Sequence, residues 1–235
     1  MLRWLYPVVC ELCGVESERS LCPACLDTLP RVPRPICLYC GTPLQEIPPD
    51  AECCDACRGK ARPFLLARSA LQRTEKNMEL LYRLKYHRHA YLASGLAAAL
   101  NELWERTPEL ADFAEAALVP VPMTRKHLRQ RGYNQAEELA RELSKLRSLP
   151  LIHALLRRET QFDSQTGLSA RQRARNAVQA YHAAPAYAEQ KKQLPPRIVL
   201  VDDVFTTGST ARACARVLRR LPGVEAVAVL TLVRA

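Results

Sequence analysis

The feature that most constrains this 235-residue chain is a set of four Cys-x2-Cys pairs within its first 60 residues. Two cysteines separated by two residues form a turn that presents both sulfurs to one metal ion, and two such turns complete the tetrahedral thiolate shell that zinc prefers. Four pairs therefore predict two closed sites with no open position for a substrate, which is typical of structural zinc. The eight predicted ligands are Cys10, Cys13, Cys22, Cys25, Cys37, Cys40, Cys54 and Cys57.

The sequence leaves the pairing of these cysteines open. The nearest-neighbour arrangement builds one site from the first two pairs and the other from the last two, whereas an interleaved arrangement uses alternate pairs. Cys53 either replaces Cys54 as a ligand or lies beside the site. Redox pairs or disulfides are the alternative, but a redox pair follows a strand in a βαβ unit and these pairs do not. Cys214 lies in a helical pattern and is expected to be a small buried apolar residue.

Two domains are expected, at residues 1–60 and 61–235. The first has many prolines and little helical or strand periodicity, so it cannot bury enough apolar surface to fold without a staple. The second has the pattern of an α/β domain with a parallel sheet, because strands alternate with helices. Strands are expected at 64–71, 117–122, 151–156, 197–203 and 224–233, and helices at 75–86, 90–104, 134–145, 170–178 and 209–221.

The chain is basic, with a formal net charge of +10. Eight zinc-bound thiolates would bring the charge to about +6, since each four-thiolate site contributes about −2. Between residues 125 and 175 there are twelve Lys or Arg and five Asp or Glu. This excess favours a polyanionic partner or a phosphate-bearing substrate, although many of these residues singly fit an ordinary solvated surface.

The sequence shows no targeting segment. It contains no run of about 20 apolar residues, so no membrane span is expected. The first ten residues lack the small-residue cleavage site of a signal peptide. We therefore expect a cytoplasmic location, where disulfides are rare and paired cysteines indicate metal.

A second motif lies near the C-terminus, where the apolar run RIVLV ends in Asp202 and Asp203. Ligands of open parallel sheets bind beyond the carboxyl ends of strands, and two adjacent carboxylates match the hydroxyl groups of a vicinal diol such as ribose. The stretch TTGST then opens a predicted helix, whose free N–H groups and positive end suit a phosphate. The motif predicts a site for ribose and then phosphate. The predicted phosphate ligands are Thr206, Thr207, Gly208, Ser209 and Thr210.

The stretch VLVDDVFTTGSTA resembles the signature of type I phosphoribosyltransferases, whose acids hold the ribose of phosphoribosyl pyrophosphate (PRPP) and whose next loop holds its 5′-phosphate. LKYHR at 84–88, VPVPMTRKHLRQRGYNQAEELA at 119–140 and QTGLSARQRARN at 165–176 are similar to the ComF family of competence-associated proteins. The resemblance covers nearly the whole chain. It implies a double zinc ribbon joined to a phosphoribosyltransferase-like domain, with a pyrophosphate loop after residue 119 and a mobile catalytic loop at 165–176.

The predicted pyrophosphate loop is rich in arginine, whose guanidinium group suits bidentate contacts to phosphate oxygens. Arg125, Arg129 and Arg131 follow a strand end and are predicted to contact pyrophosphate. Asn134 is expected to cap the next helix and is also a predicted phosphate-binding residue. Lys85 either points to the site or complements the dipole of the helix that it ends.

The predicted mobile loop contributes Gln165, Arg171 and Asn176 as candidates for closing over the site. Arg171 and Arg175 lie four residues apart, and so on one face of a helix; Gln165 and Arg175 are predicted to contact phosphate, and Arg171 is predicted to be catalytic. The alternative is an exposed basic helix without a ligand.

Two functions are consistent with these motifs. The first is a phosphoribosyltransferase that binds PRPP with Mg2+, in which Asp202, Asp203 and Arg171 position the ribose and stabilise charge while an unknown acceptor displaces pyrophosphate. The zinc module stands where such enzymes carry the hood that reads the base. The second, implied by the ComF resemblance, is a non-catalytic protein that handles single-stranded DNA with the competence machinery during natural transformation. Its phosphate site would then be a nucleotide sensor, and its basic region would follow the DNA backbone.

Overall fold

The computed structural model describes residues 7–45, 53–86, 89–159, 180–189 and 193–235. Its centre is a parallel sheet in the strand order β1-β6-β5-β2. The inner strands β5 and β6 are apolar along most of their length, as expected for strands covered on both faces. The α/β class predicted from the sequence is therefore confirmed. The strands are β1 (Leu66–Gln72), β2 (Ala117–Pro120), β5 (Arg197–Phe205) and β6 (Ala226–Arg234).

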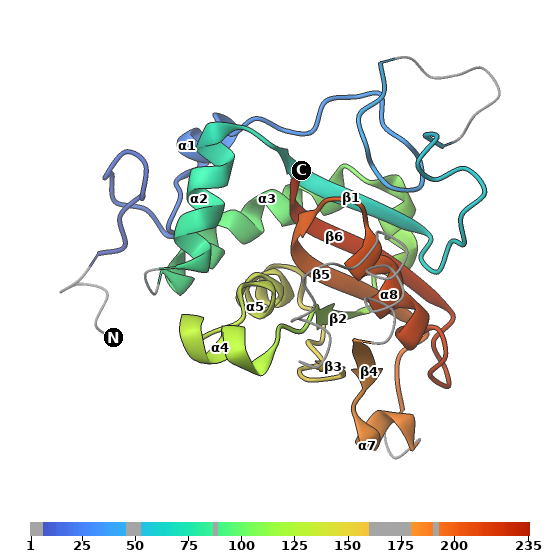
Figure 1. Ribbon diagram of the computed structural model, residues 1–235. Coiled ribbons are helices and arrows are strands. Elements are labelled where there is room, and N and C mark those ends of the chain that lie inside the picture. Colours follow the sequence, from blue (N-terminus) through green and yellow to red (C-terminus); the bar gives the residue numbers. More distant parts are fainter. Residues whose placement is uncertain (1–6, 46–52, 87–88, 160–179, 190–192) are drawn as a thin grey trace, which may run out of the picture.

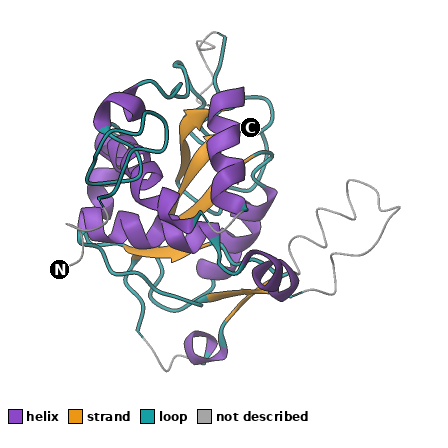
Figure 2. Ribbon diagram, turned by 90° about the vertical axis from the view of Figure 1, so that its left-hand side faces the viewer, coloured by secondary structure: helices purple, strands orange, loops and turns teal. Residues whose placement is uncertain are grey.

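Helices cover both faces of this sheet (Figures 1 and 2). One face packs against α2 (Glu75–Lys85), α3 (Ala93–Glu105) and α5 (Gln135–Arg147). The other face packs against α8 (Ser209–Leu218). Alternate residues of β5 point to opposite faces, so the strand contributes to two separate apolar clusters.

Capping side chains explain where α2 and α5 begin. The Thr74 side chain accepts a hydrogen bond from the backbone N–H of Asn77 at the start of α2. The Asn134 side chain accepts one from the backbone N–H of Ala136 at the start of α5, which confirms its predicted role as a cap. A side-chain oxygen at this position satisfies an N–H group that has no partner within the helix.

The structure adds a helix that the strand and helix pattern missed, α4 (Arg125–Arg131). Thr124 caps its start, and Gly132, with a φ of +84°, ends it in the left-handed conformation that glycine adopts without strain. Both signals are visible in the sequence. They place the three predicted pyrophosphate arginines on a helix rather than in an open loop.

The prediction of one continuous strand at 151–156 is wrong. Leu151 makes only an isolated parallel bridge to Leu118, and the chain then turns at Ala154, whose φ is +54°. Strand β3 (Leu156–Arg158) begins after this turn and pairs antiparallel with β4 (Tyr181–Ala183). The apolar run thus contains a bridge residue and the start of a strand, with a bend between them. The prediction missed this bend because apolar composition alone does not show a turn. The helix expected at 170–178 lies outside the described residues.

Three short helices complete the described elements: α1 (Pro23–Asp27), the 3-10 helix η2 (Pro108–Phe113) and α7 (Pro185–Ala188). A further 3-10 turn, η1 (Ala90–Leu92), leads directly into α3. In the part of the chain that the structure describes, no helix has the length and apolar composition needed to cross a bilayer.

The two cysteine-rich segments pack on opposite faces of the sheet (Figure 1). The first joins the apolar cluster of α2 and α3, where the Ser20 hydroxyl donates to the Leu92 carbonyl oxygen and accepts from the Gly95 N–H. The second joins the α8 cluster beside β1, where the Ala67 N–H donates to the Tyr39 carbonyl oxygen over 2.7 Å. Neither segment is therefore an appendage, because each supplies buried residues to the core of the α/β domain.

Candidate functional site

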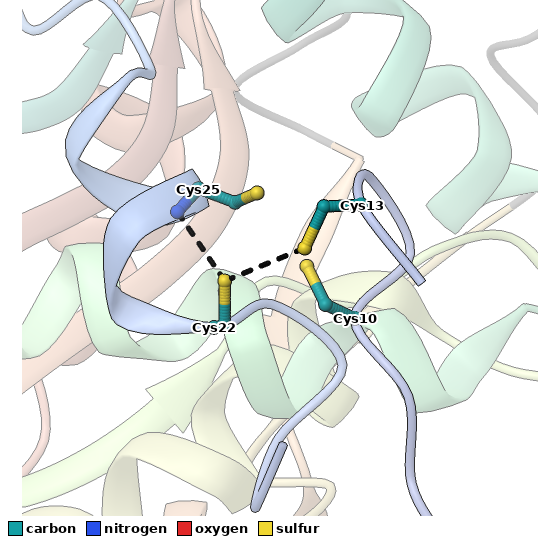
Figure 3. A group of neighbouring side chains, drawn as sticks. All are labelled: Cys10, Cys13, Cys22 and Cys25. Carbon is teal, nitrogen blue, oxygen red and sulfur yellow. Dashed lines mark hydrogen bonds between the residues drawn. The ribbon is translucent and has the colours of Figure 1, made fainter. Parts of the chain in front are cut away.

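The first cysteine cluster has the geometry of a metal site (Figure 3). The Sγ atoms of Cys10, Cys13, Cys22 and Cys25 all lie within 4.8 Å of one another, and those of Cys13 and Cys22 are 3.7 Å apart. A tetrahedron with zinc–sulfur bonds of about 2.3 Å has a sulfur–sulfur edge of about 3.8 Å. Burial opposes ionisation of the Cys10 thiol, but the N–H groups of Cys22, Leu12 and Cys13 lower its pKa to about 6. The residues therefore fit a zinc thiolate.

The second cluster repeats this arrangement with Cys37, Cys40, Cys54 and Cys57, whose Sγ atoms again lie within 4.8 Å of one another. The Cys37 sulfur accepts hydrogen bonds from the backbone N–H groups of Cys40 at 3.4 Å and Cys54 at 3.3 Å. Burial raises the pKa of the Cys37 thiol, but these N–H groups and that of Tyr39 bring it down to about 7. The nearest-neighbour pairing is thus confirmed, and the interleaved alternative is excluded.

The two remaining cysteines lie outside these clusters. Cys53 is buried, and its sulfur accepts a hydrogen bond from Arg62 at 3.5 Å, so it lies beside the second site rather than in place of Cys54. Cys214 is fully buried on α8, and burial holds the pKa of its thiol well above the usual range. It is the apolar core residue that its helical pattern predicted.

At the carboxyl end of β5 the two predicted diol ligands have different hydrogen-bond partners. The strand continues through Phe205, so Asp202 and Asp203 are consecutive strand residues, and their carboxyl groups lie close enough to interact. Asp203 is buried and accepts hydrogen bonds from Gln135 and Lys85, each over 2.9 Å. It therefore has internal partners that offset the unfavourable burial of its charge.

Asp202 is in a different environment. Its side chain is half-buried, and the loss of solvent together with the charge of Asp203 raises the pKa of its carboxyl group well above the usual range. The Asp203 N–H, which donates to Asp202 over 2.9 Å, and the Lys85 ammonium act in the opposite direction. Burial raises the pKa of Tyr181 and of Cys214, and the nearby charge of Asp202 adds to the rise of both.

Gln135 is a member of this site that sequence reasoning missed. Its amide oxygen accepts from Arg131 over 3.0 Å, and its amide nitrogen donates to Asp203. A chain of contacts thus runs from α4 through α5 and β5 to Lys85 on α2. The sequence signal that could have identified Gln135 as a site residue is its position directly after Asn134, the N-cap of α5. The contact of Lys85 with Asp203 favours the prediction that this lysine points to the site.

The turn after β5 presents its polar groups to solvent. Thr206, Thr207 and Ser209 are exposed, and the hydroxyl groups of Thr207 and Ser209 are 2.8 Å apart. Gly208 has a φ of +73°, and a Cβ at this position would lie 2.5 Å from the Phe205 ring. Both facts require glycine. The Thr210 side chain lies near Tyr181, where it opposes the rise that burial causes in the pKa of that tyrosine.

A pocket of about 870 Å³ lies where β2, α4, α5 and the β3–β4 hairpin meet. Arg125 and Asn134 line one side of it, and Arg157, Arg158 and His182 line the other. Arg129 lies on the exposed surface of α4. The predicted site residues Gln165, Arg171, Arg175 and Asn176 lie outside the described residues. The structure thus brings Lys85, Arg131 and Asp203 together, and it places Arg125 and Asn134 at the neighbouring pocket.

The fold and the cysteine centres define a protein in which a double zinc ribbon is built onto a parallel α/β domain. A model of the double zinc ribbon domain matches residues 1–62. Competence protein F of Haemophilus influenzae is 32% identical over 225 residues, which cover 93% of this chain and 92% of that protein. The chain belongs to the ComF family, and its two cysteine clusters are structural zinc sites.

Two further relatives match along most of their length. Competence protein ComFC of Bacillus subtilis is 25% identical, covering 94% of this chain and 86% of that protein. The DNA utilization protein YhgH of Escherichia coli K12 is 28% identical, covering 97% of each. The similarity therefore extends through both the zinc ribbons and the α/β domain.

Proposed function

We propose that this chain binds a phosphoribosyl ligand, PRPP together with Mg2+, at the carboxyl end of β5. We also propose that it takes part in competence or DNA utilization, the processes for which its relatives are named. The observation that carries the proposal is the pairing of Asp202 with the exposed turn at 206–209, which begins a helix. The half-buried carboxylate of Asp202 is suited to the hydroxyl groups of ribose. The turn offers hydroxyl and N–H donors for a 5′-phosphate, and the positive end of α8 adds a favourable potential.

The basic side chains near this end of the sheet support a ligand with several negative charges. Lys85 and Arg131 belong to the network around Asp203, and Arg125 lies at the pocket beside it. If a group is transferred, the acceptor forms a bond to the anomeric carbon of ribose as the bond to pyrophosphate breaks. The arginines would stabilise the charge that develops on the leaving pyrophosphate, and the pocket of about 870 Å³ is large enough for an acceptor. Mg2+ would neutralise the pyrophosphate oxygens.

Isothermal titration with PRPP and Mg2+ tests the proposal. Wild type is expected to bind, and Asp202→Asn and Thr207→Val are each expected to weaken binding about tenfold or more, because each loses a hydrogen bond to the ligand. Thr28→Val, on the first zinc ribbon, is the matched control and is expected to bind like wild type. No heat with wild type, or equal affinity in all four proteins, would contradict the proposal. Pyrophosphate release in a screen of bases, nucleotides and oligonucleotides would then distinguish transfer from binding alone.

A second function, the handling of single-stranded DNA without catalysis, is favoured by the surface of α4 and α2. Helix α4 carries Arg125, Lys126, Arg129 and Arg131 and no acidic residue. The guanidinium group of Arg131 lies over the ring of Tyr86, 5.1 Å from its centroid, and the Tyr82 ring is 4.6 Å from that of Tyr86. Tyr82 and Tyr86 are 56% and 40% exposed. Basic residues beside exposed aromatic rings are the combination by which proteins bind single strands.

The salt dependence of oligonucleotide binding tests this second function. Each phosphate contact contributes about 0.7 to the slope of log affinity against log salt concentration for single strands. We expect Lys126→Gln/Arg129→Gln to reduce that slope by about 1.4, as measured by fluorescence anisotropy. Arg216→Gln/Arg220→Gln removes the same charge from the opposite side of the sheet and serves as the control. An unchanged slope in the α4 variant, or an equal reduction in both, would exclude α4 as the binding surface.

A further inference from the structure

We propose that Arg212 and Arg234 are positioning residues that couple the second zinc site to the turn at 206–209, so that this zinc site, and not the first, controls the affinity of the turn for its ligand. The ligand part of this inference rests on the proposed function. The structural part rests on contacts that join the two segments directly.

Arg212, on α8, contacts both segments with one guanidinium group. Its Nη2 atom lies 3.6 Å from the sulfur of Cys57, and its Nη1 atom donates to the carbonyl oxygen of Thr207 over 2.7 Å. Four thiolates and one zinc ion carry a net charge of about −2, so a cation at the ligand sulfur is held electrostatically. The position of the Thr207 carbonyl is therefore linked to the metal-bound state of Cys57.

Arg234, at the end of β6, makes a second and independent connection. Its Nη1 atom donates to the carbonyl oxygens of Phe205 at 2.7 Å and Thr206 at 2.5 Å. Its Nη2 atom donates to the hydroxyl of Thr42, which lies 3.1 Å from the sulfur of Cys40. Both arginines thus reach a zinc ligand on one side, directly or through one hydroxyl, and the backbone of the turn on the other.

Aromatic packing fills the space between these two connections. The Tyr39 and Phe64 rings stack with centroids 4.5 Å apart, and the Phe205 ring lies edge-on to Phe64 at 6.5 Å. Tyr39 lies between the zinc ligands Cys37 and Cys40 in the chain, and Phe205 immediately precedes the turn. A shift of the second zinc segment would therefore also move the ring on which Gly208 packs.

The arginines act on the turn in a way that favours an anion. In a trans peptide the C=O group and the following N–H group point in opposite directions. With the carbonyl oxygens of residues 205–207 held on the arginine side, the N–H groups of residues 206–208 point to the opposite side. Among the described residues, the N–H groups of Thr207 and Gly208 donate to no protein atom. The second zinc site thus supports the donors that a phosphate would use.

The first zinc site provides the matched control within the same chain. It has the same four-cysteine geometry, but it packs against α2 and α3 on the opposite face of the sheet. Among the described residues, none of its four sulfurs contacts Arg212, Arg234 or the turn. Loss of zinc from the first site is therefore expected to change the metal content and the stability of the protein but not the contacts of Arg212 and Arg234 with the turn.

The experiment compares Cys13→Ser with Cys54→Ser, which each remove one ligand from one site. Hydrogen exchange of a peptide spanning residues 205–214 is measured together with the zinc content of each protein, because this peptide contains the Arg212 N–H group that donates to the Gly208 carbonyl oxygen of the turn over 2.9 Å. Both variants are expected to lose one zinc equivalent, but only Cys54→Ser is expected to exchange faster in this peptide, by about tenfold or more. Equal exchange rates in the two variants would overturn the proposal.

Arg212→Met and Arg212→Lys keep the inference testable if Cys54→Ser does not fold. With both zinc ions bound, Arg212→Met is expected to show faster exchange in the same peptide. Arg212→Lys should restore part of the protection, because an ammonium retains the charge but not the forked geometry. Wild-type exchange in Arg212→Met with full zinc content would contradict the role given to this arginine.

Coupling between two sites is reciprocal, so the ligand should also protect the metal. With PRPP and Mg2+ as the probe, the dissociation constant of zinc, measured by equilibrium competition with a chelator, is expected to fall by about 5- to 150-fold at the second site and to stay unchanged at the first. Tighter zinc binding at both sites, or at neither although PRPP binds, would overturn the coupling. If wild type binds no PRPP, the proposed function fails, and the exchange comparison still decides whether the zinc site supports the turn.

Discussion

Removal of both zinc ions is expected to lower the thermal unfolding midpoint of the whole chain by more than about 10 °C, and not only to disorder the ribbons. Structural zinc sites contribute about 10–16 kcal/mol to the folding of isolated zinc fingers, and about 1 kcal/mol shifts the midpoint of a protein of this size by about 2–4 °C. The effect spreads to the α/β domain because Cys10 and Leu21 belong to one of its buried clusters and Tyr39 and Cys37 to the other.

Circular dichroism during heating, before and after treatment with a zinc-selective chelator, measures this effect. Addition of zinc to the chelated protein is the control and should restore the original midpoint. An unfolding midpoint that is unchanged although the zinc content falls to zero would show that the ribbons contribute little to the core. Loss of the ribbon signal alone, with the α/β domain unaffected, would lead to the same conclusion.

The second large effect is expected for Lys85→Met. Lys85 Nζ lies 2.9 Å from the Asp203 carboxylate, whose side chain is only 9% exposed. Removal of one member of a buried ion pair leaves an uncompensated charge, which lowers the free energy of unfolding by about 3–5 kcal/mol. Denaturant unfolding measures the change. Lys145→Met breaks a pair with Glu142 on the exposed surface of α5 and should cost about 1 kcal/mol or less.

The pH dependence of Lys85→Met provides a second check. The pKa of Asp202 is raised in the folded protein by burial and by Asp203, and the charge of Lys85 opposes this rise. A carboxyl group with a raised folded pKa binds more protons in the folded state, so stability falls as pH rises above its unfolded pKa of about 3.9. Without Lys85 the pKa of Asp202 rises further. The penalty of the substitution is therefore expected to be larger at about pH 8 than at about pH 4, close to the unfolded pKa, and a smaller penalty at the higher pH would contradict this assignment.

Features with a local physical cause could be predicted from the sequence. Two cysteines with two residues between them present both sulfurs to one metal whatever the rest of the chain does, so the eight zinc ligands were identified correctly. The strand–turn–helix at 197–218 follows from an apolar run, a glycine and a helical period. Helix α4 was missed although Thr124 and Gly132 carry its capping signals, and the bend at Ala154 was missed because apolar composition does not show it.

Features that depend on contacts between distant residues were decided only by the tertiary structure. The sequence by itself determined which cysteines bind zinc and where an acidic strand end meets a glycine turn. It did not show that the two zinc sites lie on opposite faces of the sheet, or that Asp202 and Asp203 have different partners. Arg234 and Thr42 are 192 residues apart in the chain and hydrogen-bonded in the fold. A pattern along the chain reports only the preferences of neighbouring residues, whereas such pairs form when the sheet brings remote segments together.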